Sequence, residues 1–239
     1  MKPSACRLQH LLHPVHSIQT WNNFSGNNIH LKKAALIVFA ILVIDQVLKL
    51  WIKTSFYMGE NHAILGHWFY LHFTENEGMA FGMKLGGMNG KLLLSLFRIF
   101  AVIIIGWWLY KVTRKGAGNL LILCISLILA GALGNILDSA FYGMIFNEST
   151  YMQIATFFPK GGGYGSFLHG KVVDMLYFPI IESHFPAWMP LWGGEELVFF
   201  RPVFNIADSS ITTGVLILIF FQKKVFVSTH EHEIPVEKP

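Results

Sequence analysis

The chain has 239 residues, of which 53% are hydrophobic and only 13% are charged. Soluble domains carry about 25% charged residues, so this composition, with a mean hydropathy of +0.48, excludes an ordinary soluble domain and indicates an integral membrane protein. The net charge of +4 requires no nucleic-acid partner, because excess Lys and Arg in a membrane protein usually marks its cytoplasmic loops.

The chain begins with a polar segment and a first apolar run. Residues 1–31 are rich in His and Asn and lack the apolar core of a signal peptide, so we interpret them as a polar extension without regular structure. Residues 34–51 approach the roughly 20 residues that cross a bilayer. This first span contains Asp45 and Lys49, which are four positions apart and share one helix face. The pair is either a structural ion pair or it positions a substrate or a catalytic loop.

An aromatic segment follows the first span. Residues 68–73 are short and rich in β-forming residues, which favours a strand over a helix. The next segment, residues 74–82, contains Asn76 and several glycines that allow turns. We therefore predict a small strand layer outside the membrane.

Three further spans are predicted, at residues 92–110, 120–137 and 206–221. The third of the four spans ends in Asn135 and Asp138, which are three positions apart and share a face.

These elements define the expected fold class. It is a mainly α-helical membrane protein with four transmembrane helices, a small extracytoplasmic strand layer and an extracytoplasmic insertion within residues 139–202. We expect one membrane domain, residues 32–227, followed by a polar tail at residues 228–239.

Basic residues indicate the orientation. Residues 32–33, 111–115 and 223–224 carry Lys and Arg, and four crossings bring all of them to one side. The positive-inside rule makes that side cytoplasmic, with both termini inside and the strand layer outside. One set of polar residues then converges on the outer membrane boundary: Asp45, Asn76, Asn135, Asp138, Asp174, Asn205 and Asp208.

Two of these carboxylates stand out. Asp174 lies among apolar residues, and Asp208 lies where the last apolar run begins. Two carboxyl groups within a few ångströms share a proton near neutral pH, which suits general acid–base hydrolysis with an activated water. Asn76, Asn135 and Asn205 could orient a peptide or stabilise an oxyanion.

Other interpretations of the polar residues stay open at this point. Each carboxylate could be structural, and Asp208 could be the N-cap of its helix. A transporter would spread polar residues through the membrane depth, and a scaffold would tolerate Asp174→Asn. Cys6 and Cys124 lie in different predicted environments, so we expect neither a disulfide nor a cysteine metal site.

Five short motifs occur in order along the chain: Asp45-Gln46-x-x-Lys49, Asn76-x-Gly78-x-Ala80-Phe81, Gly131-x-x-Gly134-Asn135-x-x-Asp138, Val172-Val173-Asp174 and Phe204-Asn205-x-Ala207-Asp208. This set, on four predicted spans, resembles bacterial lipoprotein signal peptidase, also called signal peptidase II. The resemblance covers about residues 34–221.

The resemblance implies an aspartic endopeptidase of the bacterial inner membrane. It would remove signal peptides from diacylglyceryl-modified prolipoproteins by cutting before the modified cysteine. Asp174 and Asp208 would be catalytic, and the supporting residues would be Asp45, Lys49, Asn76, Asn135, Asp138 and Asn205. It implies no metal or other cofactor, a monomer among membrane lipids, and inhibition by globomycin-type cyclic peptides.

The chain departs from the family pattern in its third motif. Ala130 replaces a glycine, and Ser139 replaces the arginine that usually follows the motif's last aspartate. We hypothesise that Arg201 or Lys171 substitutes for that arginine. The segment at residues 139–171 is also longer than is usual in the family. It either forms a lid over the site or has no role in the activity.

Overall fold

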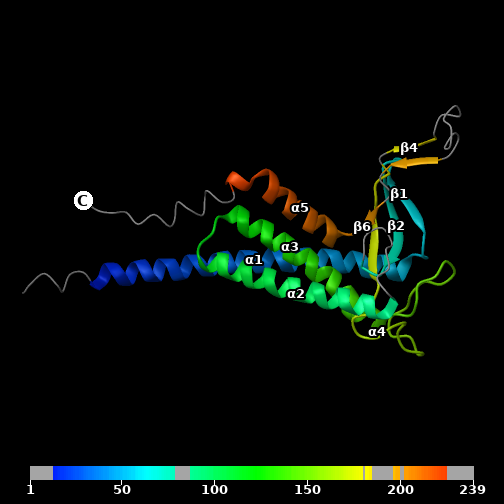
Figure 1. Cartoon of the computed structure of the whole chain (residues 1–239), viewed down its shortest axis with the longest axis horizontal. Coiled ribbons are helices and arrows are strands. Elements are labelled where there is room, and N and C mark those ends of the chain that lie inside the picture. The colour runs from blue at the N-terminus through cyan, green and yellow to red at the C-terminus, as the bar shows by residue number, and fades with distance from the viewer. Residues whose placement is uncertain (1–12, 79–86, 180, 185–195, 200–201, 225–239) are drawn as a thin grey trace, which may run out of the picture.

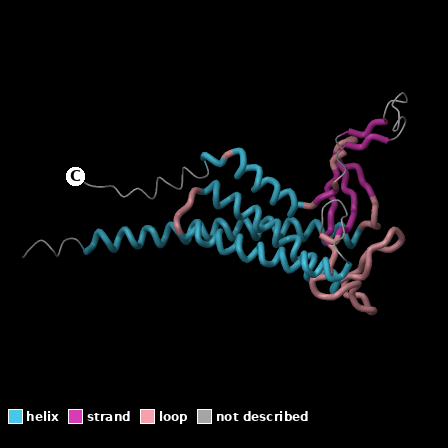
Figure 2. Tube along the Cα trace, in the orientation of Figure 1, coloured by secondary structure: helices cyan, strands magenta, loops and turns pink. Residues whose placement is uncertain are grey.

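The computed structural model describes residues 13–78, 87–179, 181–184, 196–199 and 202–224. Four helices lie side by side, and an antiparallel sheet lies across one end of them (Figure 1). Figure 2 shows the long loops of the 143–171 region at this same end, which we call the sheet end of the bundle.

The helices of the bundle are α1 (His13–Ser55), α2 (Gly87–Arg114), α3 (Asn119–Leu137) and α5 (Ile206–Phe220). Three helical stretches are long and apolar enough to cross a membrane: Asn28–Ser55, Gly90–Arg114 and Asn119–Ile145. The fourth helix, α5, is apolar but has 15 residues. At 1.5 Å per residue it covers about 22 Å, which is less than a typical hydrocarbon core of about 30 Å. The expected fold class, a helical membrane protein with a small sheet, is confirmed.

The first helix begins earlier than we expected. We predicted no regular structure before residue 32, but α1 already starts at His13. Pro14 lies in the first turn, where a missing backbone N–H is tolerated, and no other proline occurs before the helix ends at Ser55. The helix is therefore continuous from the polar extension into the apolar span.

The third span also runs further than predicted. A π-helical turn, η3 (Asp138–Tyr142), and a short helix, α4 (Gly143–Ile145), continue directly from α3. The backbone N–H of Gly170 donates to the carbonyl oxygen of Ser139 at 2.8 Å, so the insertion packs closely on the π turn. Single π turns within helices are frequent at functional sites.

The main sheet has four antiparallel strands in the order β1-β2-β3-β6. Its strands are β1 (Asn61–Leu65), β2 (Phe69–Asn76), β3 (Val172–Tyr177) and β6 (Val203–Phe204). The prediction of a strand at residues 68–73 is confirmed by β2. A separate hairpin pairs β4 (Ile181–His184) with β5 (Glu196–Phe199).

Helix α3 packs against α1, α2 and α5, and its contacts with them are the most extensive in the bundle. Glycines allow the closest of these approaches: a Cβ at Gly131 would clash with the Ala207 carbonyl oxygen, and one at Gly214 would lie 2.8 Å from the Cys124 carbonyl oxygen. The start of α5 is thereby pressed against α3.

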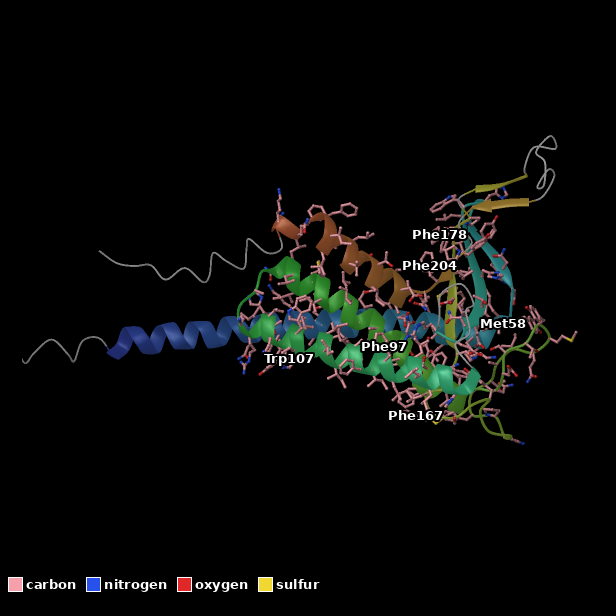
Figure 3. The ribbon with its side chains drawn as sticks, viewed as in Figure 1. Met58, Phe97, Trp107, Phe167, Phe178 and Phe204 are labelled. Atoms are coloured by element: carbon pink, nitrogen blue, oxygen red, sulfur yellow. The ribbon has the colours of Figure 1, made fainter. Side chains whose placement is uncertain are left out.

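The outer faces of the helices are apolar. Figure 3 shows Phe97 and Trp107 along α2, and their side chains are 66% and 57% exposed. Leu36 and Phe39 of α1 and Phe220 of α5 are similarly exposed. Exposed apolar residues on long helices are suited to contact with lipid chains, so the protein is a multi-pass membrane protein.

Candidate active site

The chain contains four aspartates, and all four lie where the bundle meets the sheet. Asp45 comes from α1, Asp138 from η3, Asp174 from β3 and Asp208 from the first turn of α5. One hydrogen-bonded network joins them. Carboxylates gathered at one end of the bundle do not fit a transport path with polar groups through the membrane depth.

Asp174 is buried in β3 and both of its carboxyl oxygens have partners. Asn205 Nδ2 donates to Oδ1 at 2.8 Å, and Asn76 Nδ2 donates to Oδ2. Asn76 reaches Asp174 because β2 pairs Thr74 with Asp174, which makes Asn76 a diagonal neighbour on the same face. Burial, and then the negative charge of Asp208, raise the pKa of Asp174 to about 7.

Asp208 lies close to the same network. Asn135 Nδ2 donates to Asp208 Oδ1 at 2.7 Å. Asn205 is the N-cap of α5, since its Oδ1 accepts from the backbone N–H of Asp208 at 2.8 Å. The suggestion that Asp208 is the N-cap is therefore wrong, and the Asp208 carboxylate is left free of a capping role.

A buried cation lies beneath these residues. Lys49 Nζ is 2.8 Å from Asp45 Oδ2 and 2.8 Å from Asp138 Oδ2, and it donates to Asn135 Oδ1 at 3.1 Å. The expected pairing of Asp45 with Lys49 is confirmed, and Asp138 completes an ion triad. Since the lysine and both aspartates are almost fully buried, each aspartate depends on Lys49 for its opposite charge.

The triad also fixes the backbone around the site. The remaining oxygen of Asp45 accepts from the Ala207 N–H at 2.9 Å, and Asp138 Oδ2 accepts from the Val173 N–H at 3.3 Å. Ala207 precedes Asp208, and Val173 precedes Asp174. The triad thus holds the two chain segments that carry Asp174 and Asp208.

All eight residues singled out in the sequence are brought together. They are Asp45, Lys49, Asn76, Asn135, Asp138, Asp174, Asn205 and Asp208. The arrangement presents two carboxyl groups, those of Asp174 and Asp208, above the buried ion triad. The Asn205 amide donates to the Asp174 carboxyl group and accepts from the Asp208 backbone N–H, and Asn135 donates to the Asp208 carboxyl group. Such a site can take a proton from a water and deliver one to a peptide group.

Two further residues belong to this network. Gln46 Nε2 donates to Asp138 Oδ1 at 2.9 Å, and Arg98 of α2 donates to the carbonyl oxygen of Gly78. Neither was chosen as a site residue, although each is a polar side chain within a predicted membrane span. That placement is the signal that would have found them.

A second buried ion pair lies behind the sheet. Lys53 is paired with Glu75, and its Nζ donates to Ser149 Oγ at 3.0 Å. The rings of Phe146 and Tyr164 each lie 5.2 Å from the same ammonium. The pair ties the insertion to α1 and to the end of β2, next to Asn76.

Position 139 contributes no charge. Ser139 is buried and donates to the Asn135 carbonyl oxygen at 3.0 Å. Lys171 is not its replacement, because its Nζ pairs with the exposed Glu148 at 2.8 Å, and Arg201 lies outside the described residues.

Within the described ranges, no group of three or more His, Cys, Asp or Glu side chains is arranged to hold a metal ion. Cys124 is free and buried, and Cys6 lies outside these ranges.

Comparison with known proteins places this chain in a peptidase family. The family described as signal peptidase (SPase) II matches residues 37–223. A lipoprotein signal peptidase of Porphyromonas gingivalis is 53% identical over 189 residues, which cover 79% of this chain and 81% of that protein. One from Amoebophilus asiaticus is 38% identical over 186 residues, covering 77% and 74%.

Solved structures agree with the sequence comparisons. Two chains titled as bacterial membrane enzyme structures, solved at 2.3 and 1.9 Å, have TM-scores of 0.53 and 0.51, each with 26% identity. The matches cover 86% and 80% of this chain and 95% and 92% of those chains.

The fold and the match define a membrane-embedded peptidase. The chain belongs to the signal peptidase II family, whose members remove signal peptides from lipoproteins. The resemblance stated from the five sequence motifs is therefore confirmed.

Proposed function

We propose that Asp174 and Asp208 are the catalytic dyad of this peptidase. Its substrate is a diacylglyceryl-modified prolipoprotein, which it cuts before the lipid-modified cysteine. The observation that carries the dyad is the Asn205 side chain, which donates to Asp174 and accepts from the backbone N–H of Asp208.

The two carboxyl groups have different environments, which supports different roles. The pKa of Asp174 is raised to about 7 by burial and by the negative charge of Asp208, so Asp174 can hold the shared proton near neutral pH. Asp208 lies in the first turn of α5, where the helix dipole favours a negative charge.

The proposed reaction uses both states. Asp208 takes a proton from a water, and the water oxygen attacks the scissile carbonyl carbon while Asp174 gives its proton to the carbonyl oxygen. When the tetrahedral intermediate collapses, the C–N bond breaks and the amine leaves with the proton that Asp208 accepted. One hydroxyl group of the intermediate returns its proton to Asp174 and becomes the carbonyl group of the new carboxyl end, so the dyad is regenerated. Asn76, Asn135 and Asn205 hold the two carboxylates in position.

The supporting roles follow from the buried contacts. Lys49 pairs with both Asp45 and Asp138 beneath the dyad, and the two aspartates accept from the backbone N–H groups of Ala207 and Val173. These three residues take no part in proton transfer, but their removal would displace the catalytic carboxylates.

The placement in the membrane is part of the proposal. Ala34 and Ala117 lie in one core cluster, which supports a common level for Lys32, Lys33 and the basic residues that end α2. The positive-inside rule makes this end cytoplasmic in the bacterial inner membrane, with both termini inside and the sheet end outside. The protein works as a monomer among membrane lipids, and globomycin-type cyclic peptides compete with substrate.

The test is cleavage of a diacylglyceryl-modified prolipoprotein by the purified full chain in detergent. Asp174→Asn and Asp208→Asn should each abolish cleavage before the modified cysteine while the protein stays folded. Glu148→Gln is the matched control, since it makes the same carboxylate-to-amide change at an exposed position and should keep wild-type activity.

Cleavage that survives either dyad substitution would overturn the assignment. The proposed substrate class would be overturned if the wild-type protein cleaved the same peptide equally well without its lipid group.

A further inference from the structure

Arg98 is an arginine within an apolar membrane helix. It lies in α2, is half-buried, and its Nη2 donates to the carbonyl oxygen of Gly78, just after β2 ends. Charged residues in membrane helices are costly, and those that are kept usually face the protein interior and serve a function.

A continuous path of hydrogen bonds joins Arg98 to Asp174. After Arg98 binds the Gly78 carbonyl oxygen, the Gly78 N–H donates to Asn76 Oδ1, and Asn76 Nδ2 donates to Asp174 Oδ2. Three bonds therefore separate the guanidinium from the carboxyl group. The Asn76 amide can point its Nδ2 at Asp174 because its oxygen is occupied by Gly78.

The residue between them has to be glycine. Gly78 has a φ of +95°, which disfavours any residue with a side chain. A Cβ at this position would also lie 2.5 Å from Arg98 Nη1. The backbone turn and the guanidinium are thus fitted to each other.

The charge of Arg98 also acts on the carboxylates. It interacts electrostatically with Asp208, Asp138 and Asp174. Lys49 faces Asp174 from α1, and Lys91 faces Arg98 from the same helix. Lys49 is shared by Asp45 and Asp138 and also acts on Asp174, so Arg98 adds a second positive charge near Asp174 and Asp208.

We propose that Arg98 is a positioning residue of the peptidase: through Gly78 and Asn76 it orients the Asp174 carboxyl group, and its charge favours the singly protonated dyad over the fully protonated one. The inference rests on the proposed Asp174–Asp208 dyad. Arg98 does not touch the reacting atoms in this arrangement.

The experiment measures kcat, KM and the pH profile of lipid-modified prolipoprotein cleavage for Arg98→Gln and Arg98→Lys. We expect Arg98→Gln to lower kcat about tenfold or more with a much smaller change in KM. The substitution removes the charged hydrogen bond to the Gly78 carbonyl oxygen, which is the first of the three bonds that lead to Asp174. Loss of the positive charge should also move both limbs of the pH profile upward by about half a unit or more. Arg98→Lys should restore the limbs to their wild-type positions and recover part of kcat.

Gly78→Ala provides a second approach to the same contact. Its Cβ should displace the guanidinium and reproduce the upward shift of the pH limbs, and the Gly78→Ala/Arg98→Gln double variant should be no worse than the poorer single variant. Arg114→Gln, at the exposed far end of α2, removes the same charge away from the site and should leave kcat and the limbs unchanged.

The outcomes separate the two proposals. Wild-type kcat and limbs in Arg98→Gln would overturn the role of Arg98, and so would a loss of kcat with unmoved limbs that lysine does not restore. If Arg98→Gln does not fold, unmoved limbs in Gly78→Ala would overturn it. Activity in Asp174→Asn, measured in the same series, would instead overturn the dyad itself.

Discussion

Asn205 Nδ2 donates to Asp174 Oδ1 at 2.8 Å, so the N-cap residue of α5 is also a hydrogen-bond donor to the buried carboxyl group in β3. One side chain therefore has two separable tasks. It caps α5 through its oxygen and positions Asp174 through its nitrogen.

Asn205→Ser should separate these tasks. Serine is a good N-cap but lacks the amide donor, which also reaches Val173 O and Asn135 Oδ1, so the melting temperature in detergent should fall less than in Asn205→Ala. Cleavage should fall sharply because the donor to Asp174 is lost. Asn205→Ala should lose the cap as well, which costs about 1 kcal/mol of stability. Equal activity of Asn205→Ser and wild type would show that the amide nitrogen does not position Asp174.

Cleavage should depend on pH through Asp174. Its pKa is raised to about 7 by burial and by the negative charge of Asp208, so the proton needed for catalysis is held below that pH and lost above it. We expect kcat to decline as the pH rises through about 7, measured with the lipid-modified substrate. The sign for stability is the same: the contribution of Asp174 is fully present below its unfolded pKa of about 4 and is lost as the pH rises through about 7.

A control variant checks this second effect. Asp174→Asn cannot ionise, so the decline in thermal stability between pH 5 and pH 8 should be smaller than in the wild type. An activity profile that stays flat to pH 9 would contradict the assignment of the proton to Asp174.

Lys49→Met should destabilise the protein strongly. Removal of the cation leaves Asp45 and Asp138 buried and facing each other, and loss of one member of a buried ion pair costs about 3–5 kcal/mol. The melting temperature in detergent should drop, and Asp45→Asn in the same chain should restore part of it. Lys115→Met, which removes an exposed lysine at the other end of the bundle, is the control and should melt like the wild type.

Gly131→Ala should disturb the site from a distance. The added methyl group would clash with the Ala207 carbonyl oxygen and push the start of α5, which carries Asp208, away from α3. Overpacking of this kind costs about 1–3 kcal/mol, and cleavage should fall with stability. Gly161→Ala has open space around its new methyl group and should change neither quantity. A stable and fully active Gly131→Ala protein would show that the close contact of α3 with α5 is not needed.

The sequence alone determined the class of the protein and the identity of the polar residues at its site. Apolar runs of bilayer length, few charges and basic residues at alternate span ends are local properties, and they predict membrane helices because lipid cannot satisfy exposed backbone groups. The four aspartates were recognisable because a carboxylate in an apolar run is costly unless it has a purpose.

Other features depended on the tertiary structure. Nothing local distinguishes Asn205 from Asp208 as the cap of α5, and the choice is settled by what each side chain meets: Asn205 meets Asp174, and Asp208 meets Asn135. The π turn at Asp138 packs against Gly170, which comes from a distant part of the chain, and no local pattern predicts this contact.

The cation near the dyad is likewise decided by the tertiary structure. Lys171 lies next to a motif in the sequence but pairs with Glu148, whereas the guanidinium near Gly78 comes from Arg98 of α2. A positive charge acts on whatever carboxylates lie within a few ångströms, and only the packing of α2 against the sheet end decides which these are.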